Sequence, residues 1–248
     1  MSEQIWFLKK CDLFEQLSQA ELERLETRAQ LREFPRKSMV YLPTQEARSV
    51  FLLTSGRVKI SNITQDGKQA ILAFIDPGEL FGELAVFDSS EREDYAETME
   101  KSTVVMIPAE EVRLLMEQHA HLSMGVTKLI GLRRRRIERR LKHLLFRSNR
   151  ERLIHLLLDL AEQYGYHTEQ GVQLSIKLSH QDLASVIGST RESVTVALGE
   201  LQAERYLRID RRRITLLQTD RLAAVVSTEP PQIGPAENSG PNSAVQFR

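Results

Sequence analysis

The feature that most constrains this chain is a pair of short helix signatures separated by one glycine, in the stretch "LSHQDLASVIGSTRESVTVALGEL". Ser179 and Asp182 have the spacing of a helix N-cap and its third residue, and Ser189 and Glu192 repeat that spacing. Gly188 between them supplies a tight turn. Two short helices joined in this way predict a helix-turn-helix, whose second helix can enter the major groove of DNA.

The second of these helices carries residue types that suit contacts with bases. Arginine pairs with guanine edges and glutamate accepts from cytosine. The following "RIDRRRITLL" is typical of a two-stranded wing, with Arg212 at its tip near the phosphates. The alternative is a solvated helical hairpin, which the local pattern leaves open. The residues expected on the DNA side of this helix are Thr190, Arg191, Glu192, Thr195 and Val196.

Elsewhere in the chain the spacing of the apolar residues changes twice. From Phe34 to Pro108, short apolar runs separated by turns such as Asp66-Gly67 predict antiparallel strands. From Leu122 to Phe146, apolar residues recur at helical spacing opposite arginines. A lone helix of this kind has no core of its own, so packing against a second copy is the simplest solution. The arginine run "LRRRRIERRLKH" is then a solvated face of the dimer, or alternatively a nucleic-acid patch.

These patterns predict an α+β chain. Its parts are an N-terminal all-β barrel, roll or sandwich, a long dimerisation helix and a C-terminal winged helix-turn-helix. The last residues are rich in Pro, Gly, Ser and Asn, which predicts disorder. The expected boundaries are 10–118 for the roll, 119–147 for the helix, 148–220 for the winged domain and 229–248 for the tail.

Composition excludes several classes of protein. Lys+Arg and Asp+Glu number 34 each, so the net charge is zero. Cys11 is the one cysteine, which excludes disulfides, Cys-based zinc sites and four-Cys iron–sulfur clusters; we expect no metal. We find no signal peptide and no apolar run near the roughly 20 residues of a spanning helix, so we expect a cytoplasmic protein with no membrane partner. No nucleophile–His–acid set or phosphate-binding loop indicates an enzyme.

The order of roll, long helix, "IGSTRESVT" and wing, together with "FGEL" at residues 81–84, resembles the Crp/Fnr family of bacterial transcription regulators. The resemblance spans roughly residues 10 to 220, and "IGSTR" and "IKLSHQ" are most similar to the cyanobacterial nitrogen-control branch. It implies that the N-terminal part is an antiparallel β-roll of the jelly-roll type. It also implies a homodimer that binds a pseudo-palindromic operator in double-stranded DNA and works with RNA polymerase. A cyclic-nucleotide-binding module without DNA function is the competing interpretation, which the intact "STRESVT" opposes.

The resemblance also assigns DNA contacts residue by residue. It implies base contacts for Arg191 and Glu192, phosphate contacts for Ser179 and Ser193, and a place beside the DNA backbone for Gln181. One position departs from the family pattern, because Val196 stands where a second base-contacting arginine is usual. Valine can contact only a thymine methyl group, so the operator should differ from the familiar half-site.

The roll of the cyclic-nucleotide members binds its ligand through "GEL" and an Arg-Ser-Ala turn. Gly82 and Arg92 match, but Glu93 and Asp94 replace the two small residues, and their carboxylates would repel a phosphate. On the long helix, Ile137 and Glu138 replace the adenine contacts. We therefore expect no cAMP binding and no cofactor.

The same pocket remains a candidate site for another small anionic effector. Three interpretations stay open: Arg92 is neutralised internally by Glu93, Asp94 or Glu97 with no ligand; an unidentified ligand binds; or 2-oxoglutarate binds, as the resemblance to the nitrogen-control branch implies for Arg92, Arg133 and Glu138. A dicarboxylate needs two cationic anchors, and two arginines are present. The full candidate set is Gly82, Glu83, Leu84, Arg92, Arg133 and Glu138.

Overall fold

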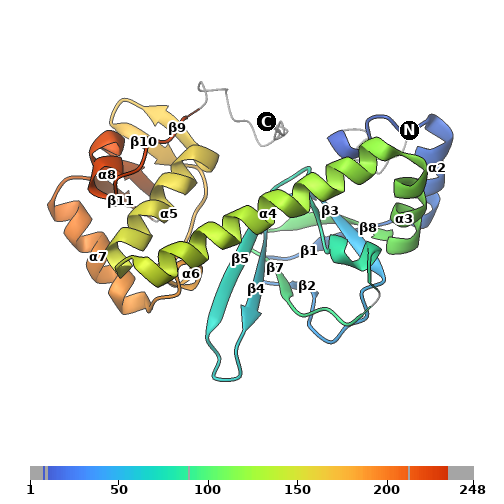
Figure 1. Cartoon of the computed structure of the whole chain (residues 1–248), viewed down its shortest axis with the longest axis horizontal. Helices are drawn as coiled ribbons and strands as arrows, with labels where there is room; N and C mark the ends of the chain where they lie inside the picture. The colour runs from blue at the N-terminus through green and yellow to red at the C-terminus, as the bar shows by residue number, and fades with distance from the viewer. Residues whose placement is uncertain (1–7, 9–10, 89, 212, 234–248) are drawn as a thin grey trace. The chain divides into compact units, whose positions relative to one another are not determined.

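The computed structural model describes residues 8, 11–88, 90–211 and 213–233, and it divides into two compact units between Arg136 and Ile137. The first unit contains the predicted roll, built from two four-stranded antiparallel sheets (Figure 1). One sheet has the order β1 (Gln30–Phe34), β8 (Ser102–Pro108), β3 (Ser49–Ser55) and β6 (Leu80–Phe81). The other has the order β2 (Met39–Tyr41), β7 (Tyr95–Thr98), β4 (Val58–Ile63) and β5 (Gln69–Ile75).

Strand β3 shows why the roll has two cores. Successive side chains of a strand point to opposite faces, so a strand covered on both sides is a continuous apolar run. Phe51 and Leu53 pack between the two sheets, with residues of β2, β4, β5 and β7. Val50 and Leu52 pack on the opposite face, against the helices. The predicted hairpin at Asp66-Gly67 is confirmed, since Gly67 has φ +79° in the turn from β4 to β5.

Helices cover the outer face of the first sheet. The predicted N-terminal helix is confirmed, with Ser18 and Glu21 forming a capping box. Leu22 and Leu25 of this helix pack with residues of the next two helices in one apolar cluster. The helical elements of this unit are η1 (Asp12–Phe14), α2 (Gln19–Arg28), η2 (Glu83–Val86), α3 (Ala109–Gln118) and the first part of α4 (Ala120–Phe146).

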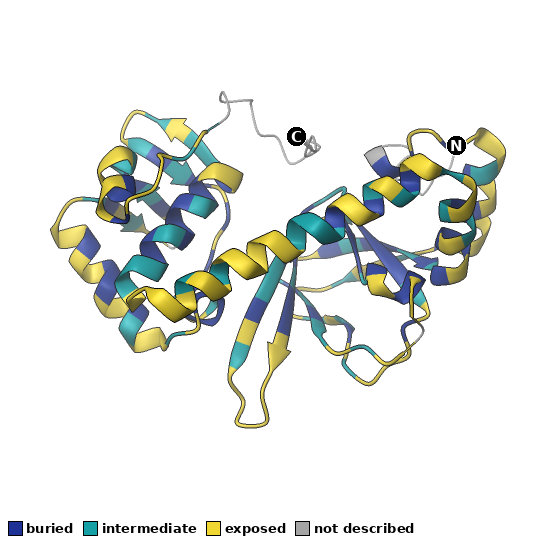
Figure 2. Cartoon of the chain, viewed as in Figure 1, coloured by how far each residue is buried: buried dark blue, intermediate teal, exposed yellow. Residues whose placement is uncertain are grey.

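Helix α4 corrects one sequence interpretation. Its first half does bury an apolar stripe within the chain itself, because Leu122, Val126 and Leu129 pack in the cluster of α2 and α3. Beyond Arg136 the stripe is exposed, and Figure 2 shows the change in burial along the helix. The exposed fraction rises from 43% for Ile137 to 74% for Phe146. The second half therefore has an exposed apolar stripe available for a partner.

The second unit is a winged helix-turn-helix around the buried helix α5. Leu153, Ile154 and Leu157 of α5 are fully buried. The antiparallel sheet has the order β11, β12, β10, β9. The elements are α5 (Asn149–Tyr164), β9 (Gly165–Thr168), β10 (Gly171–Leu174), α6 (His180–Ile187), α7 (Arg191–Ala203), β11 (Leu207–Asp210), β12 (Arg213–Leu216) and α8 (Thr219–Val225).

Helix α8 was not expected from the sequence. Leu222, Ala223 and Val226 are buried, and α8 packs against α5, so the packed unit continues beyond residue 220. Of the predicted disordered tail, residues 229–233 have no regular secondary structure and the remainder lies outside the described residues. Among the described residues, no helix combines the length and apolar character needed to cross a membrane.

Candidate nucleic-acid interface

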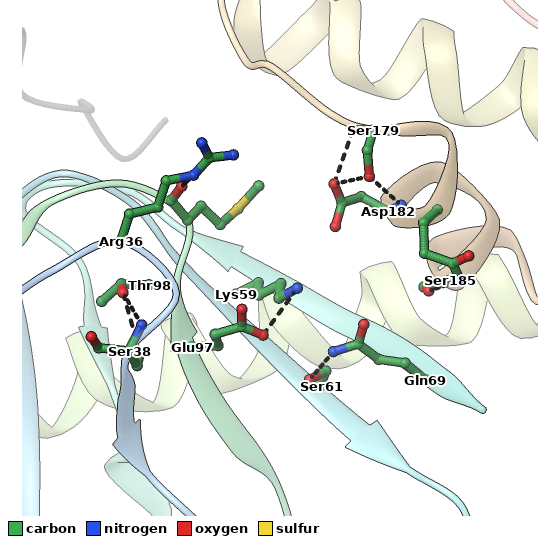
Figure 3. Close-up of polar contacts among 12 residues, drawn as sticks. Arg36, Ser38, Lys59, Ser61, Gln69, Glu97, Thr98, Ser179, Asp182 and Ser185 are labelled. Carbon is green, nitrogen blue, oxygen red and sulfur yellow. Dashed lines mark hydrogen bonds and ion pairs between the residues drawn. The ribbon is translucent and has the colours of Figure 1, made fainter. Parts of the chain in front are cut away.

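The first helix of the helix-turn-helix begins as predicted. Ser179 Oγ accepts from the backbone N–H of Asp182 at 3.1 Å, and the Asp182 carboxylate accepts from the N–H of Ser179 at 2.9 Å (Figure 3). Gly188 ends the helix in the left-handed conformation, with φ +63°. This backbone conformation favours glycine, and a Cβ at Gly188 would also lie 2.9 Å from a methyl carbon of Leu144.

The second helix begins one residue later than predicted. The N-cap of α7 is Thr190, whose Oγ1 accepts from the N–H of Ser193 at 3.2 Å and donates to the Ser193 hydroxyl at 3.0 Å. Ser189 Oγ is instead buried without a hydrogen-bond partner among the described residues. The predicted capping box of Ser189 and Glu192 is therefore wrong, because the chain enters the helix at Thr190. Thr190 has a structural role at the start of α7.

Helix α7 has one buried face and one exposed face. Val194, Leu198 and Leu201 are buried in the core of the unit. The structure brings the other predicted DNA contacts together on the exposed surface of the helix, while Ser193 is half-buried and Gln181 is exposed on α6. Val196 has 61% of its surface exposed although it is apolar. The exposed residues of α7 are Arg191, Glu192, Thr195 and Val196.

Two arginines of α5 hold this motif in place, and neither was predicted from the sequence. Arg150 makes a bidentate pair with Glu204 at 2.8 and 2.6 Å and reaches Glu200 at 3.2 Å, so it ties the end of α7 to α5. Its hydrogen bonds lower the pKa of the Glu204 carboxyl. Arg152 Nη1 donates to the carbonyl oxygen of Ile187 at 2.9 Å, just before the turn. These partners lie more than 30 residues away, and no local pattern indicated them.

The wing forms a cationic pocket with the loop before α6. Strands β11 and β12 pair antiparallel, with Asp210 opposite Arg213. Lys177, Asp210, Arg211 and Arg213 line a pocket of about 300 Å³. Among the described residues no ion pair joins these side chains, so three cations face one carboxylate. Such a pocket suits a phosphate oxygen. Arg212, predicted at the wing tip, lies outside the described residues.

The roll contains the other candidate site, centred on Arg92. Its guanidinium donates to the carbonyl oxygen of Ser49 at 2.5 Å and lies over the rings of Tyr41 and Phe51, 4.1 and 5.1 Å from their centroids. Partial burial lowers the pKa of Arg92, and Asp94 opposes this shift as a nearby negative charge. Burial raises the pKa of the Tyr41 hydroxyl, and the nearby negative charge of Asp94 adds to this shift.

The acidic residues that neighbour Arg92 in the sequence differ in whether they lie near its guanidinium. Asp94 lies close to the guanidinium, as one of the open interpretations required. Glu97 instead pairs with Lys59 at 3.1 Å across two strands (Figure 3), and Glu93 is exposed. Gly82 lies directly against Arg92, because a Cβ there would stand 2.7 Å from its Nη1.

The second arginine of the candidate effector pocket is also engaged inside the roll unit. Arg133 Nη1 donates to the carboxylate of Glu83 at 2.7 Å, and its Nη2 donates to the carbonyl oxygen of Leu80. Glu83 has only 8% of its surface exposed. Leu84 is 65% exposed, and Glu138 is an exposed residue of the second unit. Among the described residues, no cluster of three or more His, Cys, Asp or Glu is placed to hold a metal ion.

A capped recognition helix, a wing and a double-sheet roll define the class of winged-helix transcription regulators with a cyclic-nucleotide-binding-like domain. The model of the cyclic nucleotide-binding domain matches residues 31–119, and that of the Crp-like helix-turn-helix domain matches residues 151–225. The chain belongs to the Crp/Fnr family of DNA-binding transcription regulators. The resemblance stated from "IGSTRESVT" and "FGEL" is thereby confirmed.

Individual relatives agree with this assignment. The chain is 30% identical over 188 residues to the transcriptional regulator LdrP of Thermus thermophilus, covering 75% of this chain and 92% of that protein. It is 29% identical over 185 residues to the global nitrogen regulator of Nostoc sp., covering 74% and 83%. A crystal structure of a CRP-family transcriptional regulator from Thermus thermophilus superposes with a TM-score of 0.67 at 27% identity, covering 80% and 98%.

Proposed function

We propose that this regulator acts as a homodimer in the cytoplasm, binds a pseudo-palindromic operator, works with RNA polymerase and has no enzymatic activity. The observation that carries the proposal is the exposed surface of α7. Arg191 and Glu192 project from the first turn of a helix whose start is capped by Thr190 and whose end is tied to α5 by Arg150. The cationic wing pocket supplies a phosphate contact on the same unit.

The homodimer is supported by the second half of α4. Ile137, Leu141 and Leu145 follow one another at four-residue intervals, and 43%, 52% and 65% of their surfaces are exposed. Leu144, three residues after Leu141, lies on the same face of the helix and is 45% exposed. A stripe of this kind along one helix favours packing against the same stripe of a second copy. A two-fold dimer then presents two α7 helices to half-sites about one helical turn apart.

DNA binding should not require cAMP. The guanidinium of Arg92 already has an acceptor and two aromatic faces, and Asp94 is close to it. A cyclic phosphate placed at Arg92 would meet the carboxylate of Asp94, whose repulsion offsets much of the attraction.

A second candidate is regulation by a small anion such as 2-oxoglutarate. It is favoured by one observation, namely that Arg92 and Arg133 are both partly buried cations of the same unit. The two proposals are separated by selecting DNA from a random pool with the purified protein, alone, with cAMP and with 2-oxoglutarate. A sharp palindromic motif from the protein alone supports effector independence, and a motif that emerges only with 2-oxoglutarate supports the alternative.

The function itself is tested with Arg191→Ala on the selected operator. We expect binding to the operator to weaken by about 1–3 kcal/mol and the preference at one base pair to relax, because a bidentate contact with guanine is removed. The matched control is Arg205→Ala, an exposed arginine just beyond the far end of α7. Equal weakening on operator and random DNA would show that Arg191 contacts only the backbone. Enrichment of no sequence at all would refute sequence-specific binding.

A further inference from the structure

The hydroxyl of Thr195 makes two hydrogen bonds within the protein. Its Oγ1 donates to the carbonyl oxygen of Arg191, one turn earlier in α7, at 2.8 Å. His180 of α6 places its Nδ1 2.8 Å from the same Oγ1. A threonine hydroxyl has one proton, and it is directed at the Arg191 carbonyl. His180 must therefore donate to Oγ1 through Nδ1–H, which assigns the tautomer of the histidine.

This arrangement changes what Thr195 can offer to a base. Without a free proton, the hydroxyl cannot donate to guanine O6 or N7, to thymine O4 or to a phosphate. The methyl group of the Thr195 side chain makes no hydrogen bonds, so it is the part of the side chain that can contact a base. Next to it, Val196 adds two more methyl groups on a side chain that is 61% exposed. The middle of the recognition helix therefore presents an apolar surface between the acidic residues Glu192 and Glu200.

The C5-methyl group of thymine is the apolar feature of the major groove. We propose that Thr195 and Val196 together recognise a thymine methyl group in each half-site, and that His180 is a positioning residue that keeps the Thr195 hydroxyl engaged. The inference rests on the proposed function, because it requires α7 to enter the major groove.

The test uses the full-length protein and the duplex that it enriches from a random pool. Each thymine is replaced in turn by deoxyuridine, which removes only the methyl group. We expect about fourfold weaker binding for each methyl group that α7 contacts, at one or two positions of each half-site, and no effect elsewhere. Thr195→Val keeps the methyl group and should retain this penalty. Thr195→Ser and Val196→Ala remove methyl groups and should reduce it.

His180→Ala tests the positioning role through the affinity ratio of the thymine and deoxyuridine duplexes. We expect that ratio to fall, because Oγ1 then loses its donor, so the Thr195 rotamer is no longer fixed and its methyl group is no longer held against the base. If His180 has only a structural role, or contacts a phosphate, His180→Ala should weaken binding to both duplexes equally and leave the ratio unchanged. An unchanged ratio would therefore refute the positioning role of His180.

Two results overturn the methyl contact itself. One is that deoxyuridine has no effect at any position of an enriched operator. The other is that Thr195→Val abolishes the motif while Thr195→Ser keeps it, which would show that the hydroxyl accepts from a base. Failure to enrich any sequence refutes the proposed function instead, so the two failures are distinguishable.

Discussion

The cationic pocket of the wing makes a quantitative prediction about salt. Arg213 lines this pocket with Lys177 and Arg211, and its side chain is exposed with no ion pair among the described residues. Its replacement by alanine therefore removes the proposed phosphate contact without disturbing the packed core of the unit. Neutralising one phosphate contributes about 0.9 to the slope of log K against log salt concentration. Arg213→Ala in a dimer removes two such contacts, so the slope should become shallower by about 1.8.

The consequence for affinity follows from this slope. Between roughly 50 and 200 mM salt, the concentration rises about fourfold, and the affinity of the wild-type protein should fall about twelvefold further than that of the variant over that range. Fluorescence anisotropy on operator and random duplexes measures both slopes. We expect the same change on both DNAs, because a phosphate contact is independent of base sequence.

The matched control is Arg32→Ala, which removes the same charge from an exposed position of β1 in the roll. Its slope should equal that of the wild type. If Arg32→Ala and Arg213→Ala change the slope equally, the effect comes from net charge and the pocket holds no phosphate. If neither changes it, the wing does not contact DNA.

Three further predictions concern stability and ligands. Thr190→Ala should lower the free energy of unfolding by about 1 kcal/mol and Ser189→Ala should cost less, measured by urea unfolding of the full chain; the reverse order would contradict the cap at Thr190. Burial lowers the pKa of both His143 and His155, whose rings stack at 4.0 Å, so the folded state binds protons less readily than the unfolded chain. Stability should therefore fall as the pH drops below about 6.5, and His155→Leu should weaken this dependence in denaturant titrations at several pH values. Calorimetric titration with cAMP should give no saturable binding at micromolar concentrations, and a micromolar affinity would refute the argument from Asp94.

The parts predicted well from sequence are those fixed by local chemistry. The cap of Ser179, the turn at Gly188 and the hairpin at Asp66-Gly67 each depend on residues within a few positions of one another, so their spacing is visible along the chain. The predicted start of α7 was wrong by one residue, because Ser189 and Thr190 both suit an N-cap and only the packing of the turn decides between them.

The parts that were missed depend on distant contacts. Ser49 and Tyr41, which surround Arg92, lie 43 and 51 positions before it, whereas the prediction from sequence rested on the acids beside it. Arg150 and Glu204 are separated by 54 positions. Helix α8 was missed because "TDRLAAVV" is too short to show a helical periodicity. Its apolar residues are buried because the segment packs against α5, which is distant in the sequence.

The contacts of the two roll arginines set a condition for any effector of this regulator. An anion that draws Arg133 away from Glu83 leaves a carboxylate with 8% exposure unpaired, and breaking a buried pair in this way costs about 3–5 kcal/mol. An anion at Arg92 must also replace the Ser49 carbonyl and overcome the charge of Asp94. A ligand shifts an equilibrium only by its difference in affinity between two states. An effector here must therefore supply its own donor for Glu83 as well as an acceptor for Arg92. A hydroxyl-bearing anion meets that requirement, whereas a simple dicarboxylate meets only half of it.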